Sequence, residues 1–204
     1  MIMSVSIFSI NRGILKEISE QHIELEKDIQ KIVENNMYTI FGIDFVASEF
    51  ELNGLRVDSL GYDKNESNSF TITEYKRDKS FSVIDQGYAY LGLLVNNQAE
   101  FILLYNEKNK NPLRKEDVDW SQSRVIFISP FFTTYQRKAI EFKDLPMELW
   151  EARLYSNNTI LFNQIKSPER SESITKISQK SALVRSVNQQ VRVYNEDNHF
   201  EGCN

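Results

Sequence analysis

The chain has 204 residues, of which 41% are hydrophobic, 12% aromatic and 26% charged; these values are typical of a globular protein and exclude disorder throughout. A chain of this length buries one main core, so any second folded unit has to be small. The formal charge is −5, from 24 Lys and Arg against 29 Asp and Glu. That balance excludes a strong basic field around the whole molecule, so any contact with nucleic acid has to be local.

Cysteine content and hydropathy indicate the cellular compartment in which the protein is found. Cys203 is the single cysteine, which excludes an intramolecular disulfide and a cysteine-rich metal site and favours a reducing compartment. The first ten residues, MIMSVSIFSI, lack the basic start of a signal peptide. No apolar run reaches the roughly 18 residues that a membrane span needs. We therefore expect a cytoplasmic protein that does not contact the membrane.

The first third of the chain predicts a hairpin, a helix and a three-stranded meander. Alternation over 4–10 and 13–18, around a turn at 11–13, predicts the hairpin. The apolar spacing from residue 23 onward predicts a helix that ends near Asn35 and Asn36. Three strand-like runs then predict an antiparallel meander; they cover 43–52, 55–62 and 69–76.

The middle of the chain continues with helices and buried strands. Ser82 is a candidate cap for a helix from 83 to about 95. The continuous apolar run at 100–105 predicts a strand, and a similar run at 125–129 predicts another. A helix at 133–142 and a closing hairpin complete the expected elements; the hairpin strands are 149–155 and 159–163. This order predicts an α/β (α+β) fold with a mixed central sheet flanked by helices.

Composition divides the chain into four predicted parts. Residues 1–22 form the N-terminal hairpin and 23–165 the main domain. Residues 166–182 are rich in Ser and charge and are typical of a linker. Residues 183–204 carry one apolar patch, at 187–194. That patch fits either a strand that docks on the main domain or on a partner chain, or the start of a second domain.

One group of charged residues points to chemistry. Side chains alternate along a strand, so Glu74 and Lys76 share a face, and the neighbouring antiparallel strand brings Asp58 close to them. Two converging carboxylates repel each other unless one is protonated or a cation neutralises both. Carboxylate oxygens suit Mg²⁺ or Mn²⁺ better than zinc. These residues therefore predict a site for a hard divalent cation.

The order of the motif is more informative than its spacing. Glu141-Phe142-Lys143 has the same Glu-x-Lys spacing without comparable surroundings. What distinguishes the first instance is the succession of Asp58, a hairpin, Glu74-Tyr75-Lys76 and a capped helix that presents Gln86 and Tyr90 four residues apart on one face. The bland alternative is a solvated strand face with a salt bridge from Lys76 to Asp58, worth at most about 1 kcal/mol.

This succession resembles the PD-(D/E)XK nuclease superfamily, in particular the NucS-like mismatch endonucleases and tRNA-endonuclease-like folds. It also resembles an uncharacterised bacterial family with the phrase IEYKRDKNFSVIDQGYAYL, which reads TEYKRDKSFSVIDQGYAYL here. The resemblance covers residues 23–165 and implies a restriction-endonuclease-like core. The proline that names the superfamily is absent, since Arg56-Val57 precedes Asp58.

The resemblance implies roles for particular residues. Asp58 and Glu74, with the backbone carbonyl of Tyr75, would hold the metal, and Lys76 would orient or deprotonate the attacking water. Glu26, on the first helix, would complete the catalytic site, and Gln86 would support it. Residues expected to contact nucleic acid are Arg77, Lys79, Tyr90, Lys108, Lys110, Arg114 and Lys115. The loop with the last four also holds four acidic residues, so its net charge is zero.

Two functions therefore remain open at this point. One is a metal-dependent nuclease that acts on DNA in defence, restriction or repair. The other is a catalytically inactive module of the same fold that binds nucleic acid or a protein partner. Because cutting both strands of a duplex requires two sites, we also expect a homodimer.

Overall fold

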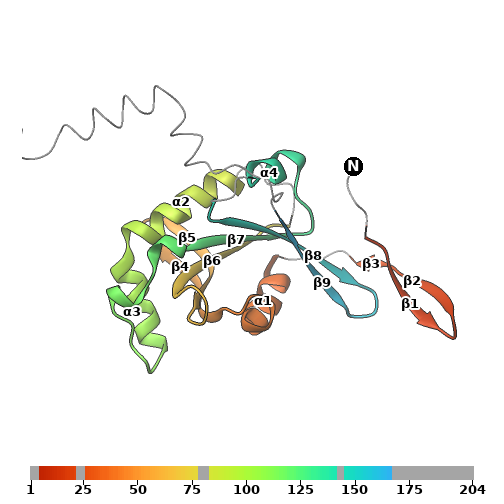
Figure 1. Cartoon of the computed structure of the whole chain (residues 1–204), viewed down its shortest axis with the longest axis horizontal. Helices are drawn as coiled ribbons and strands as arrows, with labels where there is room; N and C mark the ends of the chain where they lie inside the picture. Colours follow the sequence, from red (N-terminus) through yellow and green to blue (C-terminus); the bar gives the residue numbers. More distant parts are fainter. Residues whose placement is uncertain (1–4, 22–25, 78–82, 142–144, 167–204) are drawn as a thin grey trace, which may run out of the picture. The chain divides into compact units, whose positions relative to one another are not determined.

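The computed structural model describes residues 5–21, 26–77, 83–141 and 145–166 (Figure 1). The chain divides into two compact units, residues 1–139 with 146–166 and residues 140–145 with 167–204. All helices and strands below belong to the first unit. The predicted C-terminal segment and all but the first residue of the predicted linker lie outside the described residues. Among the described helices, none is long and apolar enough to cross a membrane.

The main sheet combines antiparallel and parallel pairing, as predicted. Its strand order in the described residues is β3-β8-β7-β6-β5-β4, with β9 also paired to β8. β4, β5 and β6 are antiparallel, whereas β6, β7 and β8 are parallel. The bounds are β3 (Glu20–Gln21), β4 (Asp44–Leu52), β5 (Leu55–Asp63), β6 (Ser69–Tyr75), β7 (Arg124–Ser129), β8 (Met147–Tyr155) and β9 (Ile160–Ile165).

A separate two-stranded hairpin confirms the N-terminal prediction. β1 (Ile7–Asn11) pairs with β2 (Ile14–Ile18), and Asn11 faces Ile14 across the turn. The two turn residues, Arg12 and Gly13, both have positive φ, 48° and 78°. Such a pair matches the twist of the flanking strands.

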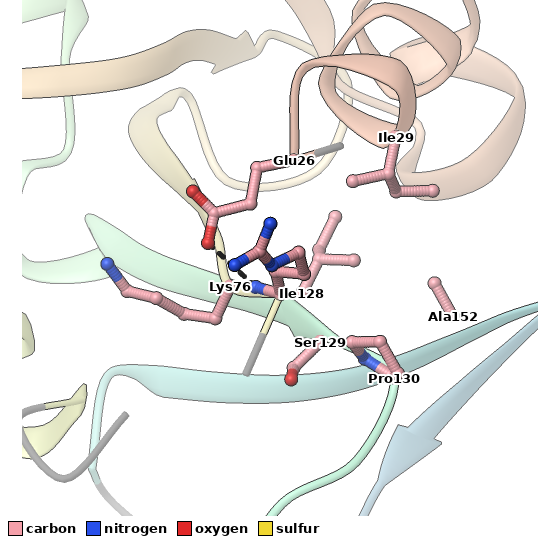
Figure 2. A pocket seen from close by; sticks show the side chains of 8 residues that line it. Glu26, Ile29, Lys76, Ile128, Ser129, Pro130 and Ala152 are labelled. Atoms are coloured by element: carbon pink, nitrogen blue, oxygen red, sulfur yellow. Dashed lines mark hydrogen bonds between the residues drawn. The ribbon is translucent and has the colours of Figure 1, made fainter. Parts of the chain in front are cut away.

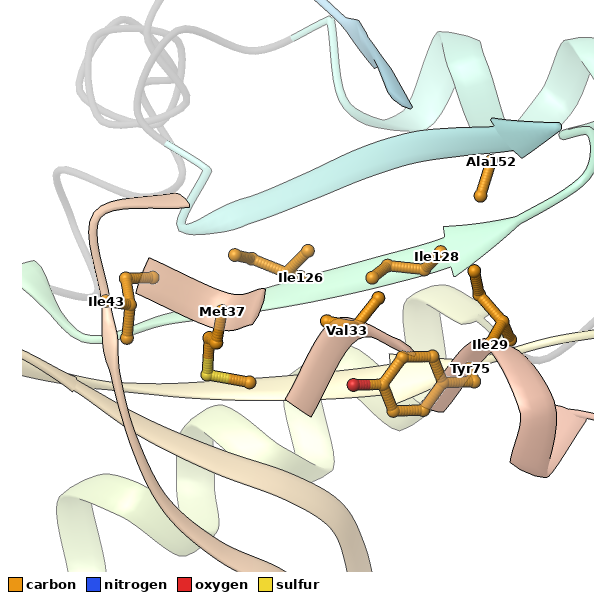
Figure 3. Packing of buried hydrophobic residues seen from close by; sticks show 8 residues of the cluster. All are labelled: Ile29, Val33, Met37, Ile43, Tyr75, Ile126, Ile128 and Ala152. Carbon is orange, nitrogen blue, oxygen red and sulfur yellow. The ribbon is translucent and has the colours of Figure 1, made fainter. Parts of the chain in front are cut away.

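Helices cover both faces of the main sheet (Figure 1). α1 (Glu26–Phe41) lies on one face, and α2 (Val83–Asn96) and α4 (Thr134–Ala139) lie on the other. α3 (Gln98–Lys108) follows α2 directly. Under α1, one buried cluster joins the helix to β6, β7 and β8 (Figure 3); it comprises Ile29, Val33, Met37, Ile43, Tyr75, Ile126, Ile128 and Ala152.

The predicted strand at 100–105 is wrong, because these residues form most of α3. Phe101 and Tyr105 are buried, one helical turn apart, and Leu103 between them is 61% exposed. A strand would have placed all three on one face. Phe101 and Tyr105 both contact the ring of Phe70 at the start of β6, so packing against the sheet selects the helix.

Two helix boundaries and one strand also differ from the sequence-based expectation. α1 continues through a kink at Asn36, whose φ is −131° and whose side chain donates to the Ile32 carbonyl at 2.8 Å, and it ends at Phe41. α4 ends at Ala139 rather than 142. β3 has only two residues, too few for an alternation pattern. The predicted cap Ser82 lies outside the described residues.

Candidate active site

The structure brings Asp58, Glu74 and Lys76 together at the end of β6. β5 and β6 are antiparallel and Ser59 faces Thr73, so Asp58 and Glu74 are next to each other across the pair. An Asp58 carboxylate oxygen (Oδ2) accepts the Tyr75 backbone N–H at 3.1 Å. Lys76 Nζ lies 2.7 Å from Glu74 Oε1. The pairing that the sequence predicted therefore produces the expected group of two carboxylates and a lysine.

α2 fixes the orientation of Glu74 from above the sheet. Gln86 Nε2 donates to Glu74 Oε1 at 2.6 Å, and the Tyr90 hydroxyl lies 2.9 Å from Oε2. The same hydroxyl lies 2.7 Å from the Arg56 carbonyl oxygen, and with one hydrogen it donates to one acceptor at a time. Glu74 is only 4% exposed, so these donors replace the water that a buried carboxylate loses.

Burial and nearby charges perturb the pKa of Asp58. Burial, followed by the charge of Glu74, raises the pKa of Asp58 from 3.8 to about 6. The Tyr75 N–H and the charge of Lys76 act in the opposite direction. Burial and the Glu74 charge also raise the pKa of the Tyr90 hydroxyl, which therefore stays protonated and able to donate. The site thus holds more negative charge than its own cation balances.

These residues fit a hard divalent cation with few protein ligands. In the described residues, no group of three or more His, Cys, Asp or Glu side chains could hold a metal ion. Mg²⁺ nevertheless retains several waters and is commonly bound by one or two carboxylates together with substrate phosphates. Asp58 and Glu74 could supply two such carboxylates, and a cation would favour the charged form of Asp58, whose pKa is raised by burial and then by the charge of Glu74. The Tyr75 side chain points into the core under α1 (Figure 3), so only its backbone carbonyl could contribute.

A small pocket lies beside Lys76 on the α1 side of the sheet (Figure 2). Glu26, at the start of α1, accepts the Arg77 backbone N–H at 2.7 Å, which ties the helix to the residue after the motif. Apolar side chains form much of the remaining wall; the lining comprises Glu26, Ile29, Lys76, Arg77, Ile128, Ser129, Pro130 and Ala152. Glu26 is therefore held near Lys76 and Arg77, and its expected part in completing the catalytic site stays a prediction.

The predicted nucleic-acid contacts do not form one surface. Arg77 is exposed next to the site, and Lys79 lies outside the described residues. Tyr90 is 2% exposed, so it is too buried to make the contact with nucleic acid that was expected of it. Its hydroxyl contacts Glu74 instead.

The basic loop after α3 lies at the opposite end of β6 from Lys76. The Asp119 N–H donates to the carbonyl of Asn68, the residue before β6, at 2.8 Å. β6 has seven residues, which corresponds to about 20 Å of extended chain. The structure therefore separates this loop from the acidic pair. The predicted contacts here are Lys108, at the end of α3, and Lys110, Arg114 and Lys115 in the loop.

A polar network beneath Asp58 was not anticipated from the sequence. Gln30, Glu34 and Ser59 form it on the α1 side of the sheet. Gln30 and Glu34 are four residues apart on α1, and Gln30 is buried next to Ile29. The sequence alone could show that Gln30 is a polar residue within the apolar stripe of a helix. It could not show that the partner of Gln30 is Asp58, 28 residues away in sequence.

Comparison with known proteins gives one close sequence relative and three distant structural likenesses. No protein-family model matches the chain. An uncharacterised protein of Haemophilus influenzae is 42% identical over 196 residues, which is 96% of this chain; the chain spans 65% of the length of that relative.

Three solved structures are similar over part of the fold. A repair endonuclease from Pyrococcus abyssi matches 65% of this chain and 50% of its own, with 21% identity and a TM-score of 0.43. EndoMS in complex with double-stranded DNA matches 67% and 54%, with 18% identity and a TM-score of 0.37. SfsA of Pyrococcus furiosus, in complex with Ca²⁺, matches 68% and 61%, with 14% identity and a TM-score of 0.34.

Proposed function

We propose that the chain is a metal-dependent nuclease that hydrolyses phosphodiester bonds in DNA, in the cytoplasm, with a role in defence, restriction or repair. The observation that supports this most is the convergence of the half-buried Asp58 and Lys76 with the buried Glu74 at the end of β6. The ordered PD-(D/E)XK-like motif in the sequence points to the same chemistry. An ion pair with only a structural role would not need a second carboxylate whose pKa is raised to about 6.

In this proposal each residue has a defined task. Asp58 and Glu74, with the Tyr75 carbonyl, hold Mg²⁺ or Mn²⁺. When bound, the ion polarises a phosphoryl oxygen and lowers the pKa of a water molecule. Lys76 Nζ, 2.7 Å from Glu74, places positive charge where the scissile phosphate would develop negative charge. Gln86 and Tyr90 hold Glu74 in its rotamer.

The proposal includes nucleic acid as substrate and a homodimer as the active form. Arg77 is the described basic residue that follows the motif on an exposed surface, so we assign it to the backbone of the substrate. A dimer supplies two sites for the two strands of a duplex. Light scattering coupled to size-exclusion chromatography tests this, and a monomer at every concentration would remove the dimer from the proposal.

Cleavage assays test the function directly. Wild type, Asp58→Ala and Lys76→Ala are compared on single-stranded, duplex, branched and mismatched DNA with Mg²⁺ or Mn²⁺. Lys64→Ala is a matched control, because Lys64 is 54% exposed and pairs with Asp44 away from the site. We expect each site variant to lose activity by about 100-fold or more, while Lys64→Ala retains it.

Two results would contradict the nuclease. Equal cleavage by wild type and both site variants would identify a contaminant. Calorimetric titration that detects no Mn²⁺ binding by wild type at millimolar metal would remove the proposed cofactor. Nucleic-acid binding without cleavage under all conditions would favour the inactive module.

A further inference from the structure

The pairing of β4 with β5 keeps its register around Asp58 but skips one position there. The register passes from Ser48 opposite Ser59 to Phe50 opposite Val57. Glu49 and Asp58 fall between these pairs and form no backbone pair in this described stretch. Glu49 has a φ of 52°, a left-handed conformation that is uncommon outside glycine. The carbonyl of a residue at such a position can accept a hydrogen bond from a donor outside the ladder.

Gln30 of α1 supplies that donor. Its Nε2 lies 3.0 Å from the Asp58 carbonyl oxygen, 3.0 Å from Glu34 Oε1 and 3.2 Å from Ser48 Oγ. Two of these acceptors, a carboxylate and a carbonyl, cannot donate, which fixes the orientation of the amide. The side chain is 8% exposed, so an unsatisfied Asp58 carbonyl would have little access to water at this point.

The same network continues to the other strand of the site. The Ser59 hydroxyl donates to Glu34 Oε1 at 2.6 Å and lies 3.1 Å from the Tyr75 hydroxyl. Tyr75 in turn donates its backbone N–H to the Asp58 carboxylate. The residues on either side of the catalytic pair are thus connected through α1, below the sheet and away from the proposed substrate.

We propose that Gln30 is a positioning residue for Asp58. By holding the peptide that follows Asp58, it keeps the Asp58 carboxylate aimed at Tyr75 N–H and at Glu74. The expected effect of Gln30 on metal affinity rests on the proposed function. Its expected effect on the position of the Asp58 carboxylate does not. Outer partners of this kind typically change metal affinity by 10- to 100-fold when removed.

The test compares two adjacent backbone amides. Tyr75 N–H donates to the Asp58 side chain, whereas Lys76 N–H donates to the Ile128 carbonyl of β7 at 2.8 Å. Gln30→Met keeps the length of the side chain and removes the donor. In Gln30→Met we expect amide hydrogen exchange at Tyr75, measured by NMR, to become about tenfold faster than in wild type. The exchange rate at Lys76 is expected to stay close to that of wild type. Mn²⁺ affinity, measured by calorimetry, is expected to fall about tenfold.

Ser48→Ala is the matched control, since it removes another neighbour of Gln30 and leaves the Asp58 contact in place. It is expected to change neither the Tyr75 exchange nor the Mn²⁺ affinity. Equal acceleration of exchange at Tyr75 and Lys76, or none at Tyr75, would overturn the inference. Wild type that binds no Mn²⁺ would instead overturn the proposed function, and the exchange comparison would still decide the role of Gln30.

A measurement on wild type covers the case in which Gln30→Met does not fold. In isotope-labelled protein we expect a scalar coupling between Gln30 Nε2 and the Asp58 carbonyl carbon. This coupling is transmitted across the hydrogen bond from Nε2 to the Asp58 carbonyl oxygen. Its absence, with couplings visible in the neighbouring ladder, would also overturn the inference.

Discussion

Glu74 is a buried carboxylate with donors on both oxygens. Lys76 and Gln86 donate to one oxygen and the Tyr90 hydroxyl lies against the other. Hydrogen bonds to a charged group contribute about 1.5–3 kcal/mol each, more than those between neutral groups. The stability of the region therefore depends on side chains that also define the geometry of the site.

Tyr90→Phe tests this dependence. The substitution leaves either Glu74 Oε2 or the Arg56 carbonyl without a donor, and we expect the free energy of unfolding to fall by about 1–3 kcal/mol. Tyr88→Phe, on the same helix but 53% exposed, is expected to change it by less than about 0.5 kcal/mol. Urea denaturation measures both, and equal losses would show that the Tyr90 hydroxyl is not satisfying a buried acceptor.

Asp58 predicts a specific dependence of stability on pH. Its folded-state pKa of about 6 lies above the ordinary value of 3.8, so the folded protein retains a proton that the unfolded chain releases. The contribution of protonated Asp58 to the free energy of unfolding is fully present below about pH 4 and is lost as the pH rises through about 6. Without metal, we expect wild type to lose on the order of 1–3 kcal/mol relative to Asp58→Asn between pH 4 and pH 8.

Denaturant unfolding in the presence of a chelator measures this difference. Parallel stability profiles of wild type and Asp58→Asn across that range would show that Asp58 titrates normally. Adding Mn²⁺ at pH 8 is expected to restore the stability of wild type and to have little effect on the variant, because the cation replaces the lost proton.

At the residue scale, the sequence was enough to predict the acidic pair but not its support. Alternation along β6 and a short hairpin place Asp58, Glu74 and Lys76 together, because both are local properties of the chain. Gln30 reaches the Asp58 carbonyl because α1 packs against this part of the sheet. That contact depends on tertiary structure, which local patterns do not encode.

At the scale of the elements, α2 is closely packed where Gly87 faces the sheet. A Cβ at Gly87 would lie 2.6 Å from Met147 Sδ and 3.2 Å from Phe127 Cε2. Met147 is 4% exposed, so it has little room to move. The absence of a side chain at this position allows α2 to approach β7 and β8, and thereby brings Gln86 and Tyr90 to Glu74.

Paired glycine substitutions in α2 test that packing. Gly87→Ala is expected to lower the free energy of unfolding by about 1–3 kcal/mol through overpacking. Gly92→Ala is expected to raise it by about 0.5–1 kcal/mol, because its Cβ would meet only Asn96 at 4.0 Å and alanine favours the helix. Thermal unfolding distinguishes the two, and a stabilised Gly87→Ala would show that the helix can shift without cost.

The elements also show where sequence patterns fail. β4, β5, β6 and β7 were predicted within one or two residues, because alternation, turns and continuous apolar runs define them. Residues 100–105 are apolar on most positions, and such a short run does not distinguish a buried helix from a buried strand. The aromatic contacts of Phe101 and Tyr105 with Phe70, absent from any local pattern, decide it.

At the scale of the whole molecule, the negative charge makes the position of each basic residue important. Binding to DNA releases counterions in proportion to the phosphates contacted, with a log–log salt slope of about −0.9 per phosphate. We expect Arg77→Glu to weaken binding and to reduce that slope by about one or more.

Lys110→Glu provides the matched control, since it makes the same charge change in the loop beyond the far end of β6. It is expected to leave the slope within about 0.3 of wild type. Fluorescence anisotropy over a range of salt concentrations measures both variants. A larger effect from Lys110→Glu would place the substrate over the α3 end of the sheet.

The peptide of Lys76 is joined to Ile128 on the parallel side of the sheet, while Asp58 approaches from the antiparallel side. Asp58, Glu74 and Lys76 therefore lie where antiparallel pairing of β6 with β5 meets parallel pairing of β6 with β7. Ile128, on β7, is more than fifty residues further along the chain than Lys76. A peptide that ends at residue 77 would carry Asp58, Glu74 and Lys76 and still lack the Ile128 carbonyl, which accepts the Lys76 backbone N–H. The arrangement of these three residues therefore depends on the assembly of both halves of the sheet, and not on the motif alone.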